Sequence, residues 1–141
     1  KLLRGDPVRV RVPYPLDGNW DDVLWGVYNA GNVVLYVDEM YGVVPIGTRA
    51  PIPLNAIYTR GRELGIGVTA VSQRPAWIPR EMVSESSWIF AFRLLQLEDR
   101  IRLKSIMGDA ALEPIRDRYG FLTYNAEWEA PVYTAQLVVR K

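Results

Sequence analysis

The spacing of apolar and polar positions changes along the chain between the repeat of a strand and the repeat of a helix. Apolar and charged residues alternate in the first predicted strand, whereas the second and third are short apolar runs introduced by glycine, as in strands buried on both faces. The predicted strands cover residues 7–12, 33–37, 67–72, 88–92, 121–124 and 132–139. Gly, Pro and Asp residues separate them, which is typical of turns.

Apolar residues three and four positions apart predict helices between these strands. The predicted helices cover residues 21–30, 54–64 and 97–107, with a helical turn at 81–84. Gly61 lies on the apolar stripe of the second helix, which predicts that this helix approaches the sheet closely. Strands alternating with helices indicate an α/β domain with a mostly parallel sheet and a β addition at the C-terminal end.

Composition narrows the chemistry that is available to the chain. Its 141 residues suffice for one domain, and they include no cysteine and no histidine. Disulfides, catalytic triads, histidine bases and zinc sites are therefore excluded, and the composition fits an intracellular protein. The net charge of +1 means that DNA would need a local basic stripe or an assembled ring. Trp77, Trp88 and Trp128 are expected in the core or an interface rather than stacked on bases.

Two adjacent carboxylates, Asp38 and Glu39, end the apolar run of residues 33–37. Burying a carboxylate costs several kcal/mol unless a partner compensates it, so the pair predicts a site. In nucleotide-hydrolysing α/β proteins the first acid of such a Walker B pair holds Mg²⁺, usually through water. The second acid orients or deprotonates the attacking water. Ordinary strand ends also carry this pattern, so the motif alone leaves both interpretations open.

The segment of residues 60–75, Arg-Gly-Arg-Glu-Leu-Gly-Ile-Gly-Val-Thr-Ala-Val-Ser-Gln-Arg-Pro, resembles the FtsK/HerA superfamily of DNA-translocating ATPases. Members of this superfamily show an Arg-x-x-Gly helix end and then a strand that ends in Ser/Thr-Gln-Arg-Pro. Residues 89–94 and 98–100 resemble the next strand and the start of the next helix. The likeness covers about residues 33–107 and implies a RecA-like P-loop NTPase core that uses ATP and Mg²⁺.

The resemblance implies a role for each matching residue. Asp38 would be the acid associated with Mg²⁺, and Glu39 would activate the water that attacks the γ-phosphate. Gln73 would be the polar sensor of the γ-phosphate, and Arg62 would act as an arginine finger in the site of a neighbouring subunit. The structural alternatives are a Gln73 that only caps its strand and an Arg62 that pairs within its own subunit.

Three further arginines are candidates for contacts with phosphate, with an interface or with DNA. Arg60 lies roughly opposite Arg62 around the helix, so we expect only one of the two at the interface. Arg74 could contact phosphate or an acid across the interface, with a structural role in the following turn as the favoured alternative. Arg49 lies in the middle of the loop of residues 40–53, which we expect to face DNA.

The phosphate-cradling sequence Gly-x-x-x-x-Gly-Lys-Ser/Thr (Walker A) is absent from the 141 residues. Either the sequence begins after that loop, with residues 1–6 as the tail of the helix that follows it, or the domain has lost nucleotide binding. The chain retains Asp38, Glu39, Arg62 and Gln73 together, which favours the first interpretation. The 141 residues would then be a single ATPase domain, the C-terminal and larger part of its core. Alone, they should hydrolyse ATP poorly.

The expected function is ATP-driven translocation of double-stranded DNA by a ring, a hexamer or a pentamer, with ATP bound between subunits. Viral genome packaging is the first choice, with a portal or another packaging protein as a partner and the host cytoplasm as the location. A HerA-like or conjugative DNA-processing ATPase is the close alternative. The rivals are a phage-assembly ATPase of the secretion type and a non-catalytic subunit that binds DNA or a partner on a degenerate P-loop fold.

Overall fold

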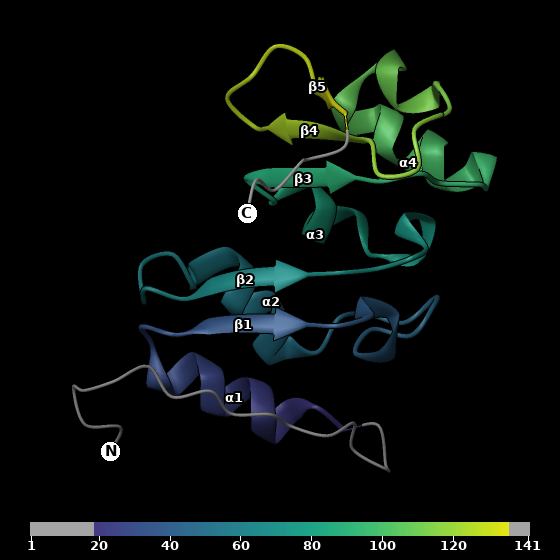
Figure 1. Ribbon diagram of the computed structural model, residues 1–141. Helices are drawn as coiled ribbons and strands as arrows, with labels where there is room; N and C mark the ends of the chain where they lie inside the picture. The colour runs from purple at the N-terminus through teal and green to yellow at the C-terminus, as the bar shows by residue number, and fades with distance from the viewer. Residues whose placement is uncertain (1–18, 136–141) are drawn as a thin grey trace, which may run out of the picture.

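The computed structural model describes residues 19–135, so the predicted strand 7–12, the predicted helix tail 1–6 and the end of the last predicted strand lie outside the described residues. The elements in chain order are α1 (Asp21–Ala30), β1 (Val34–Val37), the 3-10 helix η1 (Met40–Gly42), α2 (Ile52–Arg60), β2 (Gly67–Ala70), the 3-10 helix η2 (Pro75–Trp77), α3 (Arg80–Ser84), β3 (Trp88–Ala91), α4 (Leu97–Met107), the 3-10 helix η3 (Asp109–Leu112), β4 (Phe121–Asn125) and β5 (Val132–Thr134). Figure 1 shows their arrangement.

The described strands form a small parallel sheet and an antiparallel C-terminal sheet. In the parallel sheet β1 pairs with β2, and Val37 lies opposite Ala70. In the second sheet β4 pairs with β3 on one side and with β5 on the other, antiparallel in both cases. The predicted α/β class and the C-terminal β addition are confirmed. The prediction of a mostly parallel sheet is wrong for the described strands, because only β1 and β2 pair in parallel and β3 pairs antiparallel with β4. The chain returns through β4, which lies directly alongside β3 and occupies one of the two hydrogen-bonding edges of β3.

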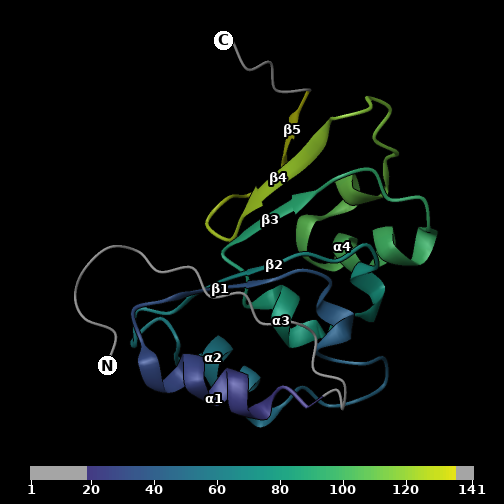
Figure 2. The same ribbon diagram turned by 60° about the horizontal axis from the view of Figure 1, so that its bottom comes forward.

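Two apolar clusters lie between the strands and the helices. The first joins α1, α2 and η1 to the parallel sheet and has Leu24, Met40, Leu54 and Ile57 at its centre. The second joins α4 to the antiparallel sheet, with Leu103 and Met107 facing that sheet. Figures 1 and 2 together place α2, α3 and α4 on the same side of the strands. Among the described residues, no helix has both the length and the apolar character needed to cross a bilayer.

The boundaries of α2 differ from those predicted. The helix begins at Ile52 rather than at residue 54, because a proline in the first turn lacks only an N–H that the helix does not use. It ends at Arg60, where Gly61 caps it by donating its N–H to the Ile57 carbonyl at 2.8 Å, and residues 61–65 form turns. A Cβ on the buried Gly61 would lie 2.3 Å from the Ile57 carbonyl oxygen and 3.3 Å from the Ile66 Cβ. The nearer of these atoms belongs to α2 itself, so the close approach of Gly61 to the sheet stays a prediction.

Candidate functional site

The two adjacent acids lie just beyond β1, at the carboxyl edge of the parallel sheet, where Asp38 is exposed and Glu39 is half-buried. Because the two strands are parallel, β2 ends at the same edge. The Val71 N–H donates to the Val37 carbonyl at 2.9 Å, and the Met40 N–H donates to the Val71 carbonyl at 2.9 Å. These bonds continue the pairing past the strands and fix the residues that follow each of them.

Ser72 contacts Glu39 directly. Its hydroxyl donates a hydrogen bond of 2.9 Å to Glu39 Oε1, and its Oγ accepts one of 3.2 Å from the Arg74 N–H. A hydrogen bond to an ionised carboxylate is among the stronger ones, so it holds the Glu39 side chain in one orientation. Ser72 belongs to the Ser-Gln-Arg-Pro segment, but no separate role was predicted for it. The signal was present, because continuing the β1–β2 register by two residues places Ser72 opposite Glu39.

The backbone of Glu39 adopts a left-handed conformation, with a φ of 64°. A non-glycine residue in this region is strained by about 1–3 kcal/mol, and such strain persists where the surrounding structure imposes it. Here the surrounding structure is the end of β1 and the start of η1. In η1, the Gly42 N–H donates a hydrogen bond of 3.0 Å to the Glu39 carbonyl. The tight turn directs the Glu39 side chain toward the residues that follow β2.

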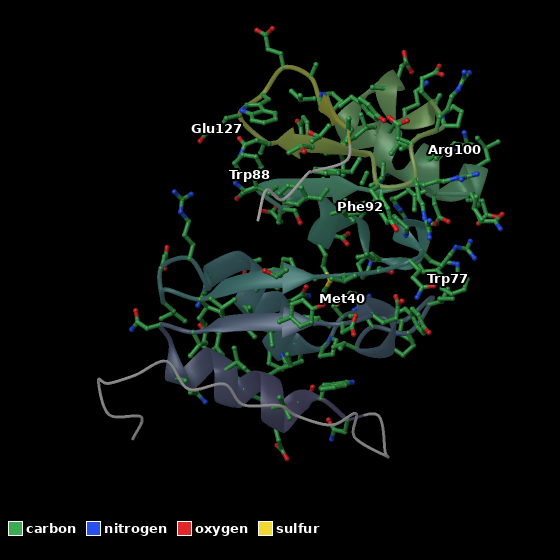
Figure 3. The ribbon with its side chains drawn as sticks, in the orientation of Figure 1. Met40, Trp77, Trp88, Phe92, Arg100 and Glu127 are labelled. Atoms are coloured by element: carbon green, nitrogen blue, oxygen red, sulfur yellow. The ribbon has the colours of Figure 1, made fainter. Side chains whose placement is uncertain are left out.

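Gln73 is exposed and follows Ser72 at the same edge. The structure therefore brings Asp38, Glu39 and Gln73 to one edge of one sheet, as the sequence predicted. The loops that follow them also touch each other: the rings of Tyr41 and Trp77 meet edge to face, with 5.8 Å between their centroids. Figure 3 shows Trp77 beyond the arrowhead of β2.

Arg74 is anchored to α4 within its own chain. Its Nε donates to Asp99 Oδ2 at 2.9 Å, and its Nη2 lies 3.3 Å from Glu98 Oε2. Its guanidinium carbon lies 4.3 Å from the centroid of the Trp77 ring. Asp99 is 1% exposed and also accepts the Ala76 N–H at 3.0 Å, so this buried charge has both a cation and a backbone donor. This geometry favours the structural role for Arg74.

The other candidate arginines lie elsewhere. Arg60 and Arg62 are exposed, at the end of α2 and in the turn after it, and this turn leads into the first residue of β2. They therefore lie at the amino edge of the sheet, opposite the edge that carries Glu39. Arg49 is exposed in the loop between η1 and α2. Within one copy of the chain, Arg62 and Glu39 are not part of the same site.

The residues at the carboxyl edge can be compared with the ligands that a metal ion needs. Among the described residues, no three acidic side chains are grouped so that they could hold a metal by themselves. Asp38 offers a single exposed carboxylate at the strand end. Mg²⁺ is commonly bound through one or two carboxylates, with water and substrate phosphates as its other ligands. The donor set therefore fits a Mg²⁺ ion that arrives with a nucleotide.

Comparisons with known proteins found no family model that matches the chain. The chain is 33% identical to the DNA packaging ATPase P9 of Enterobacteria phage PRD1 over 97 residues, which are 69% of this chain and 40% of P9. Its structure matches B204, the DNA-packaging ATPase from Sulfolobus turreted icosahedral virus, with a TM-score of 0.72 and 17% identity over 89% of this chain and 66% of B204.

The genome packaging NTPase B204 from Sulfolobus turreted icosahedral virus 2, in complex with ATP-gammaS, matches with a TM-score of 0.69 and 17% identity. That match covers 84% of this chain and 59% of B204. The chain thus spans less than two thirds of the length of each of these relatives.

Asp99→Ala should destabilise the fold strongly, because it leaves the Arg74 guanidinium and the Ala76 N–H without their partner. Breaking a buried ion pair costs about 3–5 kcal/mol, and the partial exposure of Arg74 lowers our expectation to about 2–4 kcal/mol. Urea unfolding would measure this loss in the free energy of unfolding. The matched control is Glu98→Ala, whose side chain is 71% exposed and which should change stability by less than about 1 kcal/mol. Equal effects of the two variants would contradict the role assigned to Asp99.

Proposed function

We propose, because the chain is homologous to the viral DNA packaging ATPase P9, that it is part of an ATP-driven motor that packages double-stranded viral DNA. This homology confirms the resemblance that the Ser-Gln-Arg-Pro segment predicted. The motor would act as a ring of five or six subunits, with a portal or another packaging protein as its partner, in the host cytoplasm. In the packaging reaction this chain would supply the carboxylates that act on water and metal.

One observation carries the catalytic part of the proposal: Glu39 is strained, oriented by Ser72 and placed beside the exposed Asp38 and Gln73. A carboxylate that only ended a strand would need neither a left-handed backbone nor a dedicated hydroxyl donor. The arrangement matches the needs of phosphoryl transfer to water, in which a positioned base takes a proton and a nearby acid supports the metal. A RecA-like core with this edge as its nucleotide site is the corresponding fold.

Each residue at this edge has a separate task in the proposed reaction. Glu39 accepts the proton of the attacking water on the carboxylate oxygen that Ser72 does not hold. Asp38 would hold Mg²⁺, and that ion would supply charge neutralisation at the phosphates. The Gln73 amide donates to the γ-phosphate or to the attacking water. Loss of that contact after hydrolysis would be transmitted to the loop that follows Gln73.

The position of Arg62 supports a role in a neighbouring subunit. It is exposed at the amino edge of the sheet, so it would complete a site only by reaching the carboxyl edge of the next copy in a ring. A cation placed against the transferring phosphoryl group contributes about 10³–10⁵ in rate. Arg49 is a candidate for DNA contact. The phosphate-binding loop would lie in a segment outside these 141 residues.

Glu39→Gln should abolish ATP turnover in the protein from the full reading frame and leave ATP binding intact, because the amide cannot accept the proton of water. Steady-state ATP hydrolysis with and without double-stranded DNA tests this, beside nucleotide binding measured by fluorescence. DNA-stimulated turnover that the variant loses would support the proposal. Normal turnover by the variant would remove Glu39 from the mechanism, and a wild-type protein without turnover would point to an assembly subunit.

Ser72→Ala should lower kcat by about tenfold with little change in the KM for ATP, because a hydrogen bond to a charged group contributes about 1.5–3 kcal/mol. Ser72→Thr keeps the hydroxyl and is the matched control, with a kcat close to that of the wild type. Thermal unfolding of both variants checks that the fold is intact. An unchanged kcat in Ser72→Ala would show that Glu39 needs no orienting donor.

Arg62→Ala should reduce turnover by a factor of about 10³ or more while the variant still binds ATP, because the arginine acts on the neighbour's nucleotide. Arg60→Ala, two residues earlier at the end of α2, is the control and should retain activity. Mixing Arg62→Ala with Glu39→Gln subunits should restore part of the activity, since some interfaces then combine an intact Glu39 with an intact Arg62. If the mixture stays inactive while both variants still form rings, the arginine does not act between subunits.

A further inference from the structure

The backbone of Ala76, three residues after Gln73, is held by two side chains of α4. Its N–H donates a hydrogen bond of 3.0 Å to Asp99 Oδ1, and its carbonyl accepts one of 3.0 Å from Arg102 Nη2. Residues three positions apart in a helix lie on the same face, so both side chains extend from the face of α4 that meets η2. We call these two contacts the Ala76 clamp.

The segment between the Ala76 clamp and Gln73 is short and stiff. It consists of Arg74 and Pro75. The Arg74 side chain is bound to Asp99 Oδ2 at 2.9 Å, and the Arg74 N–H donates to Ser72 Oγ at 3.2 Å. The ring of Pro75 holds its own φ at about −65° and leaves little freedom to the chain. The backbone is therefore fixed immediately before and after Gln73.

The Gln73 side chain depends on this backbone for its position. Gln73 is exposed, and its side chain has no hydrogen-bond partner among residues 19–135. The path of the chain through residues 72–76 therefore sets the direction in which the amide extends. A group that must meet a reacting atom is sensitive to such placement, since a displacement of about 1 Å can cost about 10²-fold in rate.

The charge of Asp99 is the second observation that points to a role in positioning. Asp99 is 1% exposed, whereas the packing of α4 on the antiparallel sheet comes from the apolar Leu103 and Met107. A buried ion pair stabilises a fold no better than apolar side chains of similar volume, and its best attested use is to specify one arrangement among several. The arrangement that Asp99 specifies is the path of the chain directly after Gln73.

We propose that Asp99 and Arg102 are positioning residues for ATP hydrolysis and that they act through Gln73, whose amide the Ala76 clamp aims at the nucleotide site. This rests on the proposed function, in which that amide donates to the γ-phosphate or to the attacking water. Neither side chain of the clamp touches the nucleotide. Loss of the clamp therefore lowers kcat and leaves the KM for ATP nearly unchanged, as expected for an interaction that matters in the transition state.

A double-mutant cycle in the protein from the full reading frame tests the proposal, because residues that act through one another have non-additive effects. Arg102→Ala removes the donor to the Ala76 carbonyl and should lower kcat about tenfold. In a Gln73→Ala background the same change should lower kcat by less than about twofold, since the amide that the clamp positions is then absent. Gln73→Asn serves as the background if Gln73→Ala has no measurable turnover. Arg102→Lys keeps a donor and should recover most of the kcat.

The matched control is Arg100→Ala. Arg100, labelled in Figure 3, belongs to the same helix and also donates to a backbone carbonyl, that of Leu112 in η3 at 2.8 Å. Because it does not contact the loop after Gln73, its removal should change kcat by less than about twofold. Thermal unfolding of every variant checks the fold. If Arg102→Ala does not fold, Asp99→Asn enters the same cycle, because it keeps an oxygen for the Ala76 N–H and loses only the charge.

Equal losses of kcat for Arg102→Ala in both backgrounds would overturn the proposal, because Arg102 would then act independently of Gln73. A raised KM with an unchanged kcat, or an equal loss in Arg100→Ala, would overturn it as well. Each of these outcomes leaves the proposed function standing, since the wild type still hydrolyses ATP. A wild-type protein without turnover, with or without double-stranded DNA, would instead reject the proposed function and the positioning role together.

Discussion

The parallel pairing of β1 with β2 is the constraint on which the candidate site depends. Since Val37 lies opposite Ala70, both strands end at the same edge, and the residues that follow them turn within hydrogen-bond distance of each other. The Ser72 hydroxyl reaches Glu39 only in this register, because a slip of one residue would reverse every side chain of the strand. The same register buries Val37 in the apolar cluster, so core packing and site geometry enforce each other.

A second set of contacts connects this edge to the rest of the molecule. Arg74 follows the Ser72–Gln73 pair directly and is tied to α4 through the buried Asp99. Trp77 stacks on Arg74 and meets Tyr41, which lies two residues after Glu39. The two loops at the edge therefore form one packed unit with α4. In the proposed motor, these contacts would connect a change in what Gln73 or Glu39 binds to that helix.

In the proposed motor, the chain carries part of the hydrolytic site. It holds two carboxylates, an orienting hydroxyl and an amide at one edge, and its candidate finger Arg62 lies at the other edge. In the proposed motor a neighbouring subunit supplies the arginine, and a further segment of the same protein supplies the phosphate-binding loop. Among residues 19–135, β2 pairs only with β1 and β3 pairs only with β4.

The sequence by itself determined the local helices and strands and which edge of the parallel sheet carries the candidate site. Helices α1 and α4 have the predicted boundaries, and the predicted strand ends brought Asp38, Glu39 and Gln73 together, because periodicity and adjacency are local properties. Only the tertiary structure decided that β3 pairs with β4 and that Arg74 pairs with Asp99, 25 residues away. It also decided that Ser72 holds Glu39. Each depends on which segments pack side by side, and no single segment of sequence encodes a contact with a distant partner.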